Sequence, residues 1–294
     1  MERVTFPSHG ETLVGHLYPP TPSEASEPHP TVVLLGPETF VKEQAPSAYA
    51  RRLAREGVAA LAFDPRYWGE STGEPERWEN PDHKVEDVFA AVDYLTERAD
   101  IGAVGGFALC HGCAEMVRAA ADDDRIGATV CVAGHYRDEE SDADWLGPAA
   151  LDARRERGEA AVQRFEETGR VDYVPAAHPD RGDVGMPGHH VWEWYRTWAA
   201  REWDNRYAVL SDADVLDYES LSAARRLRSP MLMVHSDRCA LPSAARRHFA
   251  AVPAREKQLV WDGDTPHFAY YDEPAVVRRT ARLAASWYGR HLAT

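Results

Sequence analysis

The feature that most constrains the fold of this chain is the alternation of short apolar segments with longer amphipathic segments. The apolar segments are typical of buried strands, and the amphipathic segments have the period of helices. The expected strands are residues 4–6, 12–18, 31–35, 58–63, 101–108, 126–133, 230–234 and 257–261, and the expected helices are residues 44–56, 85–99, 111–121, 243–251 and 274–291. The predicted fold class is therefore α/β, with a mostly parallel central sheet and helices on both of its faces.

A stretch rich in charged and aromatic residues interrupts this alternation. We expect residues 136–227 to form a helical cap insertion, and residues 1–135 and 228–294 to form one core domain. The insertion follows the sixth strand, on the side where active-site loops emerge, so its aromatic residues are candidates to line a substrate pocket. We select Trp192 and Tyr195, although such residues also serve to dock a cap on a core.

Cys110 lies between an expected strand, residues 101–108, and an expected helix, residues 111–121. A sharp strand–turn–helix elbow lifts one side chain above a sheet, and small residues two positions to either side allow the backbone to pack closely. Ala108 and Gly112 occupy those positions. Cys110 is therefore a candidate nucleophile, with a buried core cysteine as the alternative.

A cysteine nucleophile needs a base, and in the elbow architecture that base follows the final strand. His267 lies in the loop after the strand at residues 257–261 and precedes the last expected helix. A third member of the site belongs after the preceding strand, where a carboxylate would orient the imidazole. Asp237 is the only acid in that loop, and it is also suited to form a turn.

Acyl chemistry also requires hydrogen-bond donors for a developing oxyanion. The backbone amide of His111 directly follows the nucleophile at a helix N-terminus and is one candidate. The second donor belongs in the loop after the strand at residues 31–35, where we select the amides of Thr39 and Phe40. Glu38 in the same loop is expected near the site, with a solvent-exposed side chain as the alternative.

These residues resemble the dienelactone hydrolases, which are α/β-hydrolases with a Cys-His-Asp triad. The wider chain is similar to a broad bacterial α/β-hydrolase group, through the segments Val41–Gln44, Phe63–Ser71, Glu79–Pro81, Val234–Asp237 and Tyr271–Pro274. The resemblance implies the α/β-hydrolase fold, and it implies that Glu38 helps to convert the cysteine to a thiolate. Ala108 in the elbow and Cys239 in the acid loop depart from the family pattern, and Cys239 stands where many hydrolases keep the triad acid.

A further segment follows the strand at residues 58–63, at the end of the sheet where open α/β folds bind ligands. Arg66, Tyr67 and Trp68 in this segment are candidate substrate-binding residues. A guanidinium can hold a substrate carboxylate through two hydrogen bonds, but it also pairs with nearby acids, and Glu70 is one such acid here.

The composition limits the partners and the compartment. The net charge of −15 disfavours nucleic acid and anionic membrane surfaces as partners. Four cysteines in 294 residues indicate no disulfide framework. We expect no signal peptide, no membrane span, no metal and no cofactor, and we expect a cytoplasmic enzyme with a small-molecule substrate. A homodimer stays an open alternative.

The leading hypothesis is a cysteine-dependent hydrolase of an ester, lactone or thioester that forms an acyl-cysteine at Cys110. In this hypothesis His267 activates water for deacylation, and Asp237 assists it. One alternative is acyl transfer, cyclisation or a lyase step at the same site. Another is a non-catalytic binding protein with a degenerate triad.

Overall fold

The computed structural model describes residues 1–21, 28–199 and 201–292, and it contains an eight-stranded sheet. The strands are β1 (Glu2–Ser8), β2 (Glu11–Tyr18), β3 (His29–Leu35), β4 (Ala59–Asp64), β5 (Ile101–Leu109), β6 (Ile126–Val132), β11 (Met231–His235) and β12 (Lys257–Trp261). Their order across the sheet is β1-β2-β4-β3-β5-β6-β11-β12. Residues 22–27, which belong to the loop expected between the second and third strands, are outside the described residues.

Parallel pairing dominates the sheet. The strands from β4 to β12 pair in parallel, whereas β1 pairs antiparallel with β2, and β2 pairs antiparallel with β4. The central strands β3 and β5 are apolar and almost entirely buried, as expected for strands that are covered on both faces. The carboxyl ends of β3, β5 and β6 therefore meet at one edge of the sheet, where the loops that follow them can form a site.

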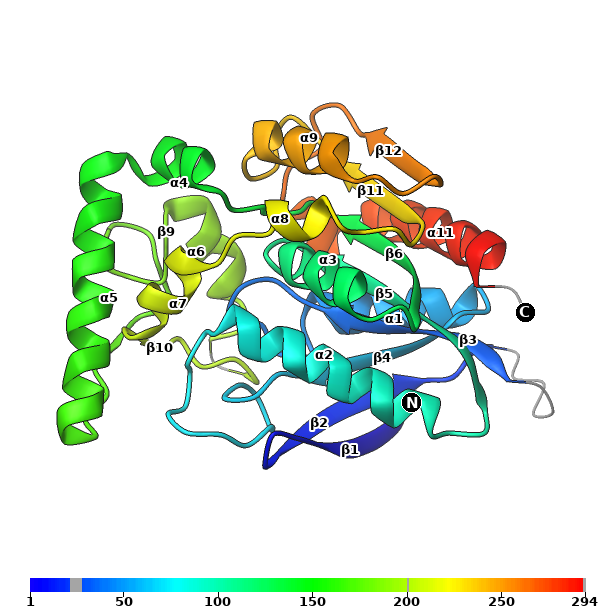
Figure 1. Ribbon diagram of the computed structural model, residues 1–294, viewed down its shortest axis with the longest axis horizontal. Helices are drawn as coiled ribbons and strands as arrows, with labels where there is room; N and C mark the ends of the chain where they lie inside the picture. Colours follow the sequence, from blue (N-terminus) through cyan, green and yellow to red (C-terminus); the bar gives the residue numbers. More distant parts are fainter. Residues whose placement is uncertain (22–27, 200, 293–294) are drawn as a thin grey trace.

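Helices cover both faces of the sheet (Figure 1). One buried cluster joins the sheet to α1 (Ala45–Arg55) and α11 (Pro274–His291). A second cluster joins the other face to α2 (Pro81–Thr96), α3 (Gly112–Asp122), α8 (Leu221–Ala224) and α9 (Pro242–Ala251). The structure thus confirms the predicted α/β class and the order of strands and helices in the core.

Two differences from the predicted elements have local causes. Helix α2 begins at Pro81, four residues earlier than expected, because the Asn80 side chain accepts a hydrogen bond from the His83 amide and caps the helix. The short helix α10 (Ala269–Asp272) directly follows His267 and was not predicted, since four residues are too few for a periodic pattern.

The elements between β6 and β11 are mainly helical. They comprise α4 (Glu139–Leu146), α5 (Pro148–Thr168), α6 (His189–Tyr195), α7 (Ser211–Asp217) and α8, with short strand pairs formed by β7 (Tyr173–Val174) and β10 (Tyr207–Ala208), and by β8 (Ala177–His178) and β9 (Met186–Pro187). Helices α4 to α7 lie beside the core sheet in Figure 1, whereas α8 packs on the core. The domain boundaries predicted at residues 136 and 227 stay a prediction.

Across the part of the chain that the structure describes, each helix is too short or too polar to cross a lipid bilayer.

Candidate active site

Cys110 occupies the turn between β5 and α3 with a backbone φ of 53°, in the left-handed region that side chains other than glycine rarely adopt. Its amide donates to the carbonyl oxygen of Val132 at 3.2 Å, and its own carbonyl accepts from the amide of His135 at 2.9 Å. Hydrogen bonds to the chain that follows β6 therefore hold the unusual conformation. This strand–turn–helix geometry is that of a nucleophile elbow.

Gly112 allows the elbow to approach the end of β3. A Cβ atom at this position would lie 2.4 Å from the carbonyl oxygen of Gly36, which is closer than atoms in proteins pack. The close approach brings the loop after β3, which contains Glu38, next to the elbow. This packing therefore requires glycine at position 112. Ala108, at the other small-residue position of the elbow, is fully buried in β5.

A pocket of about 460 Å³ opens beside Cys110. The core contributes residues from the loops after β3, β5, β11 and β12, among them Glu38, Cys110, Cys239, His267, Phe268 and Tyr271. The insertion contributes side chains that close the pocket from the other side, namely Trp145, Met186, Pro187, His190, Val191 and Tyr195. A mostly apolar cavity with a few polar groups is typical of a small-molecule site.

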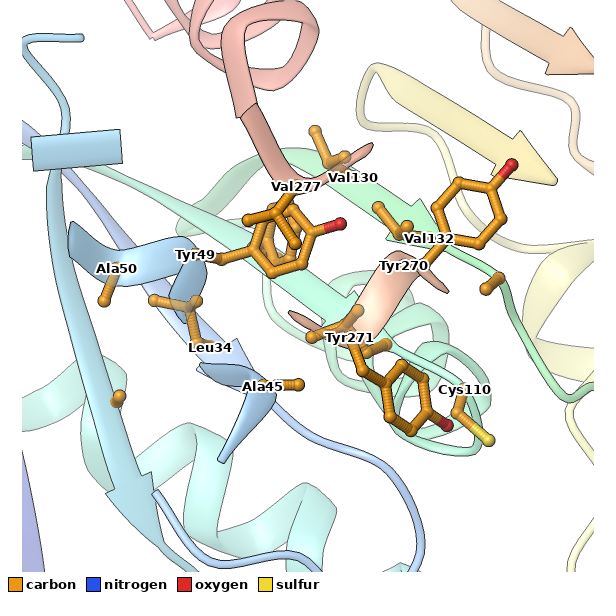
Figure 2. Packing of buried hydrophobic residues seen from close by; sticks show 14 of the residues in the cluster. Leu34, Ala45, Tyr49, Ala50, Cys110, Val130, Val132, Tyr270, Tyr271 and Val277 are labelled. Carbon is orange, nitrogen blue, oxygen red and sulfur yellow. The ribbon is translucent and has the colours of Figure 1, made fainter. Parts of the chain in front are cut away.

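The Cys110 thiol is a neutral group in this environment. Burial raises its pKa to about 12, and hydrogen bonds from the Tyr271 hydroxyl and the His111 amide offset this effect only in part. Figure 2 shows the Tyr271 ring reaching toward Cys110, with its hydroxyl oxygen near the sulfur, whereas Tyr270 points away. The raised pKa therefore favours the thiol over a thiolate at rest.

His267 lies behind Tyr271 as seen from the thiol. The Nε2 atom of His267 is 2.9 Å from the Tyr271 hydroxyl, and its Nδ1 atom accepts a hydrogen bond from the Ala240 amide at 3.3 Å. Because Nδ1 acts as an acceptor, the proton of the neutral imidazole is on Nε2 and points toward Tyr271. Burial, with smaller effects from His235 and His190, lowers the pKa of His267 and favours this neutral form.

Asp237 lies apart from His267. Its side chain is 63% exposed, and its carboxylate accepts a hydrogen bond from the Trp261 indole at 2.9 Å and lies 3.5 Å from the Arg246 guanidinium. Among the described residues, the hydrogen-bond partners of His267 are Tyr271 and Ala240, so no carboxylate orients the ring. Asp237 lies near the start of the loop after β11, which is why its place in the chain suggested a triad acid. Its side chain, however, turns toward Trp261 of β12 and away from His267.

Glu38 is buried and lines the pocket, contrary to the alternative of a solvent-exposed side chain. Within the described residues its Oε1 atom has no hydrogen-bond partner. The loop around it is firmly held, because the Tyr195 hydroxyl donates to the Glu38 carbonyl at 2.8 Å and the Trp203 indole donates to the Thr39 carbonyl at 2.7 Å. A buried carboxylate oxygen without a donor leaves an acceptor site free toward the pocket.

The candidate oxyanion donors differ in availability. The His111 amide faces the Cys110 sulfur and is therefore directed at the reacting atom. The Thr39 amide, in contrast, donates to the Glu79 carboxylate at 3.2 Å and is occupied in this structure. The Phe40 amide stays a prediction as the second donor.

A buried ionic cluster lies beneath the elbow. The Lys84 ammonium contacts Glu79 and lies 3.8 Å from Glu115, and the Glu115 carboxylate is 3.1 Å from Nδ1 of His111. Burial opposes the charge on Lys84, but the Glu115 and Glu79 carboxylates raise its pKa and keep it charged. The acidic residues and His111 could otherwise hold a cation, but here the ammonium supplies the positive charge.

The substrate-binding residues predicted after β4 lie elsewhere. Arg66 is buried against Asp87 and Glu86 of α2, at 2.7 and 2.6 Å, and not against the suggested Glu70. Tyr67 hydrogen-bonds to His83, and the Trp68 indole donates to the carbonyl of Trp78. These three side chains are outside the pocket beside Cys110, because strand β3 separates β4 from β5.

The two aromatic residues predicted from the insertion have different positions. Tyr195 lines the pocket, whereas Trp192 packs near His178 at a ring distance of 6.3 Å and is outside the lining. Sequence reasoning missed Tyr271, Trp145 and Phe268 as lining residues. The four-residue spacing between His267 and Tyr271 was the available signal, since residues four apart lie on one face of a helical turn.

Comparison with known proteins identifies similar chains, although no protein-family model matches. The uncharacterized protein PA2218 of Pseudomonas aeruginosa is 28% identical over 289 residues, which are 92% of this chain and 76% of that protein. The thiohydrolase aneE of Aspergillus aculeatus is 31% identical over 105 residues, 35% of this chain and 33% of that protein.

Solved structures show the same fold. The crystal structure of PA2218 superposes with a TM-score of 0.84 at 24% identity, covering 99% of this chain and 93% of that one. The α/β hydrolase GrgF of a Penicillium species superposes with a TM-score of 0.82 at 20% identity, covering 100% and 99%. A dienelactone hydrolase of Anabaena variabilis gives 0.60 at 15% identity, covering 99% and 98%. The chain therefore has the α/β-hydrolase fold, as predicted, and its structural neighbours include hydrolases.

Proposed function

We propose that this protein is a hydrolase that cleaves an ester, lactone or thioester through an acyl-cysteine intermediate at Cys110. The observation that carries the proposal is the Cys110 thiol, which is held in a strained elbow at the floor of an apolar pocket, beside a buried carboxylate with an unpartnered oxygen. Strained backbone of this kind persists where the surrounding structure enforces it, often at catalytic sites. The hydrolase names of structural neighbours support the same class.

In the proposed acylation, Glu38 accepts the thiol proton when substrate enters. The thiolate sulfur forms a bond to the carbonyl carbon, and the carbonyl electron pair moves to oxygen, where the His111 amide stabilises it. The carbon–leaving-group bond then breaks as the carbonyl reforms. We assign the thiol proton to Glu38 and not to His267, because neither ring nitrogen of His267 is free to accept it. Nδ1 already accepts from the Ala240 amide, and Nε2 already carries a proton that it donates to the Tyr271 hydroxyl.

In the proposed deacylation, water adds to the acyl carbon and the carbon–sulfur bond breaks. The sulfur recovers its proton from Glu38. Of the two water protons, one stays on the acid product and the other replaces the proton that the leaving group takes up from the site. Asp237 takes no part in this scheme, since its carboxylate is engaged with Trp261.

The pocket favours a substrate with an apolar acyl group. Met186, Val191 and Tyr195 from the insertion face Phe268 and Tyr271 from the core across the pocket. We therefore propose that residues 136–227 act as a cap that supplies one wall of the site. The similarity to a protein named a thiohydrolase supports the inclusion of thioesters among the candidate substrates.

The test is direct observation of the acyl-enzyme. A panel of alkyl esters, lactones and acyl thioesters is incubated with the protein, and intact-mass spectra followed by peptide mapping locate any acyl group. We expect an adduct at Cys110 and loss of turnover in Cys110→Ala. Cys131→Ala, a change within β6 on the far side of the sheet from the pocket, serves as the matched control and keeps activity. Full turnover by Cys110→Ala contradicts the proposal.

A second candidate keeps the acyl-cysteine and changes its fate. The walls of the pocket are mostly apolar, which favours transfer to a second nucleophile or cyclisation of the acyl group over hydrolysis. Turnover in water enriched in oxygen-18 separates the two outcomes, because hydrolysis places the heavy isotope in the product and transfer does not.

A further inference from the structure

Tyr271 lies between the imidazole of His267 and the thiol of Cys110 (Figure 2). Its ring is buried, its hydroxyl oxygen lies near the Cys110 sulfur (Figure 2), and the same oxygen is 2.9 Å from Nε2 of His267. The group that faces the reacting sulfur is therefore a phenol and not the imidazole.

The hydrogen bonds around His267 fix the direction of the protons. The Ala240 amide donates to Nδ1, so Nε2 carries the proton and donates to the Tyr271 oxygen. The hydroxyl proton of Tyr271 is then free to point toward the Cys110 sulfur and the pocket, which lie on the other side of the oxygen (Figure 2). At rest, the series of hydrogen bonds from the Ala240 amide through His267 to Tyr271 therefore presents the Tyr271 O–H group to the Cys110 sulfur.

We propose that Tyr271 is a catalytic acid that protonates the leaving group when the acyl-cysteine forms, with His267 as its positioning residue. As the carbon–oxygen bond of an ester breaks, the departing oxygen takes the electron pair and the Tyr271 proton. The Nε2 proton of His267 stabilises the phenolate that remains. In deacylation the attacking water gives its proton to this phenolate, which restores the hydroxyl.

The same geometry predicts which substrates depend on Tyr271. An alkoxide is a strong base and leaves readily only when it is protonated, whereas an aryl oxide or a thiolate leaves without a proton. The inference rests on the proposed acyl-cysteine chemistry, and it predicts that the Tyr271 hydroxyl accelerates the cleavage of alkyl esters and lactones.

The test compares substrates with one acyl group and different leaving groups. For Tyr271→Phe, we expect kcat/KM for the alkyl ester to fall about 100-fold or more, the usual contribution of a general acid. For the p-nitrophenyl ester and the thioester, we expect a fall of no more than about threefold, since kcat/KM reports steps through leaving-group release. Tyr270→Phe is the matched control, because its hydroxyl donates to Asp262 outside the pocket, and it changes neither value.

Each outcome bears on one proposal. Equal losses for all three leaving groups, or no loss for the alkyl ester, overturn the assignment of Tyr271, since a purely structural role affects all substrates alike. If Cys110→Ala retains full turnover, the acyl-cysteine mechanism itself is wrong. If Cys110→Ala is inactive and Tyr271→Phe shows no leaving-group dependence, only the role of Tyr271 is wrong.

Discussion

The carboxylate of Asp237 accepts a hydrogen bond from the Trp261 indole, with 2.9 Å between Oδ1 and Nε1. This contact directs the only acid of the loop after β11 toward β12 and solvent, where its side chain is 63% exposed. The imidazole of His267 is instead oriented by the Ala240 amide and the Tyr271 hydroxyl. The site is thus built on a cysteine, a phenol and an imidazole, with a carboxylate from the loop after β3.

The position of Asp237 leads to the first prediction. Asp237→Asn preserves the size of the side chain and is expected to keep kcat/KM within about threefold, because an exposed group outside the site contributes little. Steady-state kinetics on the best ester of the panel measure the effect, with His267→Ala as the variant expected to lose activity. A loss of about 10⁴-fold in Asp237→Asn, the size seen when a triad acid is removed, would mean that Asp237 reaches His267 during turnover.

The raised pKa of Cys110 predicts slow alkylation of the resting enzyme. With a pKa of about 12 in the folded protein, the thiolate fraction stays small below pH 10 and increases about tenfold for each pH unit. We expect iodoacetamide to label Cys110 at least about 100-fold more slowly than free glutathione at pH 8. Peptide mapping must separate Cys110 from Cys239, which also lines the pocket and whose pKa burial raises to about 11.

The control for this measurement is Glu38→Gln. If Glu38 accepts the thiol proton only with substrate bound, the change lowers kcat/KM, whereas alkylation of the resting enzyme is not slowed, because loss of the Glu38 charge removes one of the effects that raise the pKa of Cys110. Rapid labelling near neutral pH in the unmodified protein would show a resting thiolate instead and would contradict the neutral thiol.

The sequence was sufficient to predict the sheet and the helices of the core, because apolar strands and amphipathic helices carry their periods locally. The same reasoning placed Cys110 at the elbow and His267 after β12, since both positions follow from the order of elements. It could not predict that Asn80 and Pro81 start α2 early, because residues 81–84 lack the apolar spacing that continues from Val85.

The arrangement within the site depends on side-chain contacts between distant segments, and the sequence predicted it less well. Arg66 was expected at a ligand, but Asp87 on α2, 21 residues later, pairs with it. Tyr271 was not selected as a site residue, since its four-residue spacing from His267 indicates only that the two residues lie on one face and not that the hydroxyl faces a thiol. Such a role becomes visible only when the ends of β5 and β12 are placed in space.

The close approach of Gly112 to Gly36 predicts the effect of a single methyl group. Gly112→Ala would place Cβ 2.4 Å from the Gly36 carbonyl oxygen, so the elbow or the loop after β3 must move. We expect a loss of about 1–3 kcal/mol in the free energy of unfolding, together with reduced acylation of Cys110. Urea unfolding and intact-mass spectra measure the two effects.

Gly289→Ala is the matched control for this change. Gly289 lies in α11, and a Cβ atom there would meet nothing within 4 Å. Replacing a helical glycine with alanine is expected to stabilise the protein by about 0.5–1 kcal/mol. If both alanine variants have the same stability, the packing of the elbow against β3 is looser than the structure shows.

The cluster beneath the elbow leads to the last prediction. Lys84→Met removes the ammonium that contacts Glu79 and leaves two carboxylates buried without a positive partner. We expect a loss of about 3–5 kcal/mol in the free energy of unfolding at neutral pH, as is typical when one member of a buried ion pair is removed. Arg282→Met, which breaks an exposed ion pair with Glu56, should change stability by no more than about 0.5 kcal/mol.

The pH dependence of this loss has a defined sign. Burial already raises the pKa of Glu79 to about 7 against the opposing effect of Lys84, so loss of the ammonium raises this pKa further above its unfolded value. Ionisation of Glu79 then destabilises the fold at high pH, and the penalty decreases as the pH falls and the carboxyl group becomes protonated. Urea unfolding from pH 8 to pH 5 measures this difference, and a loss that is constant across the range would show that Lys84 stabilises the protein through packing and not through its charge.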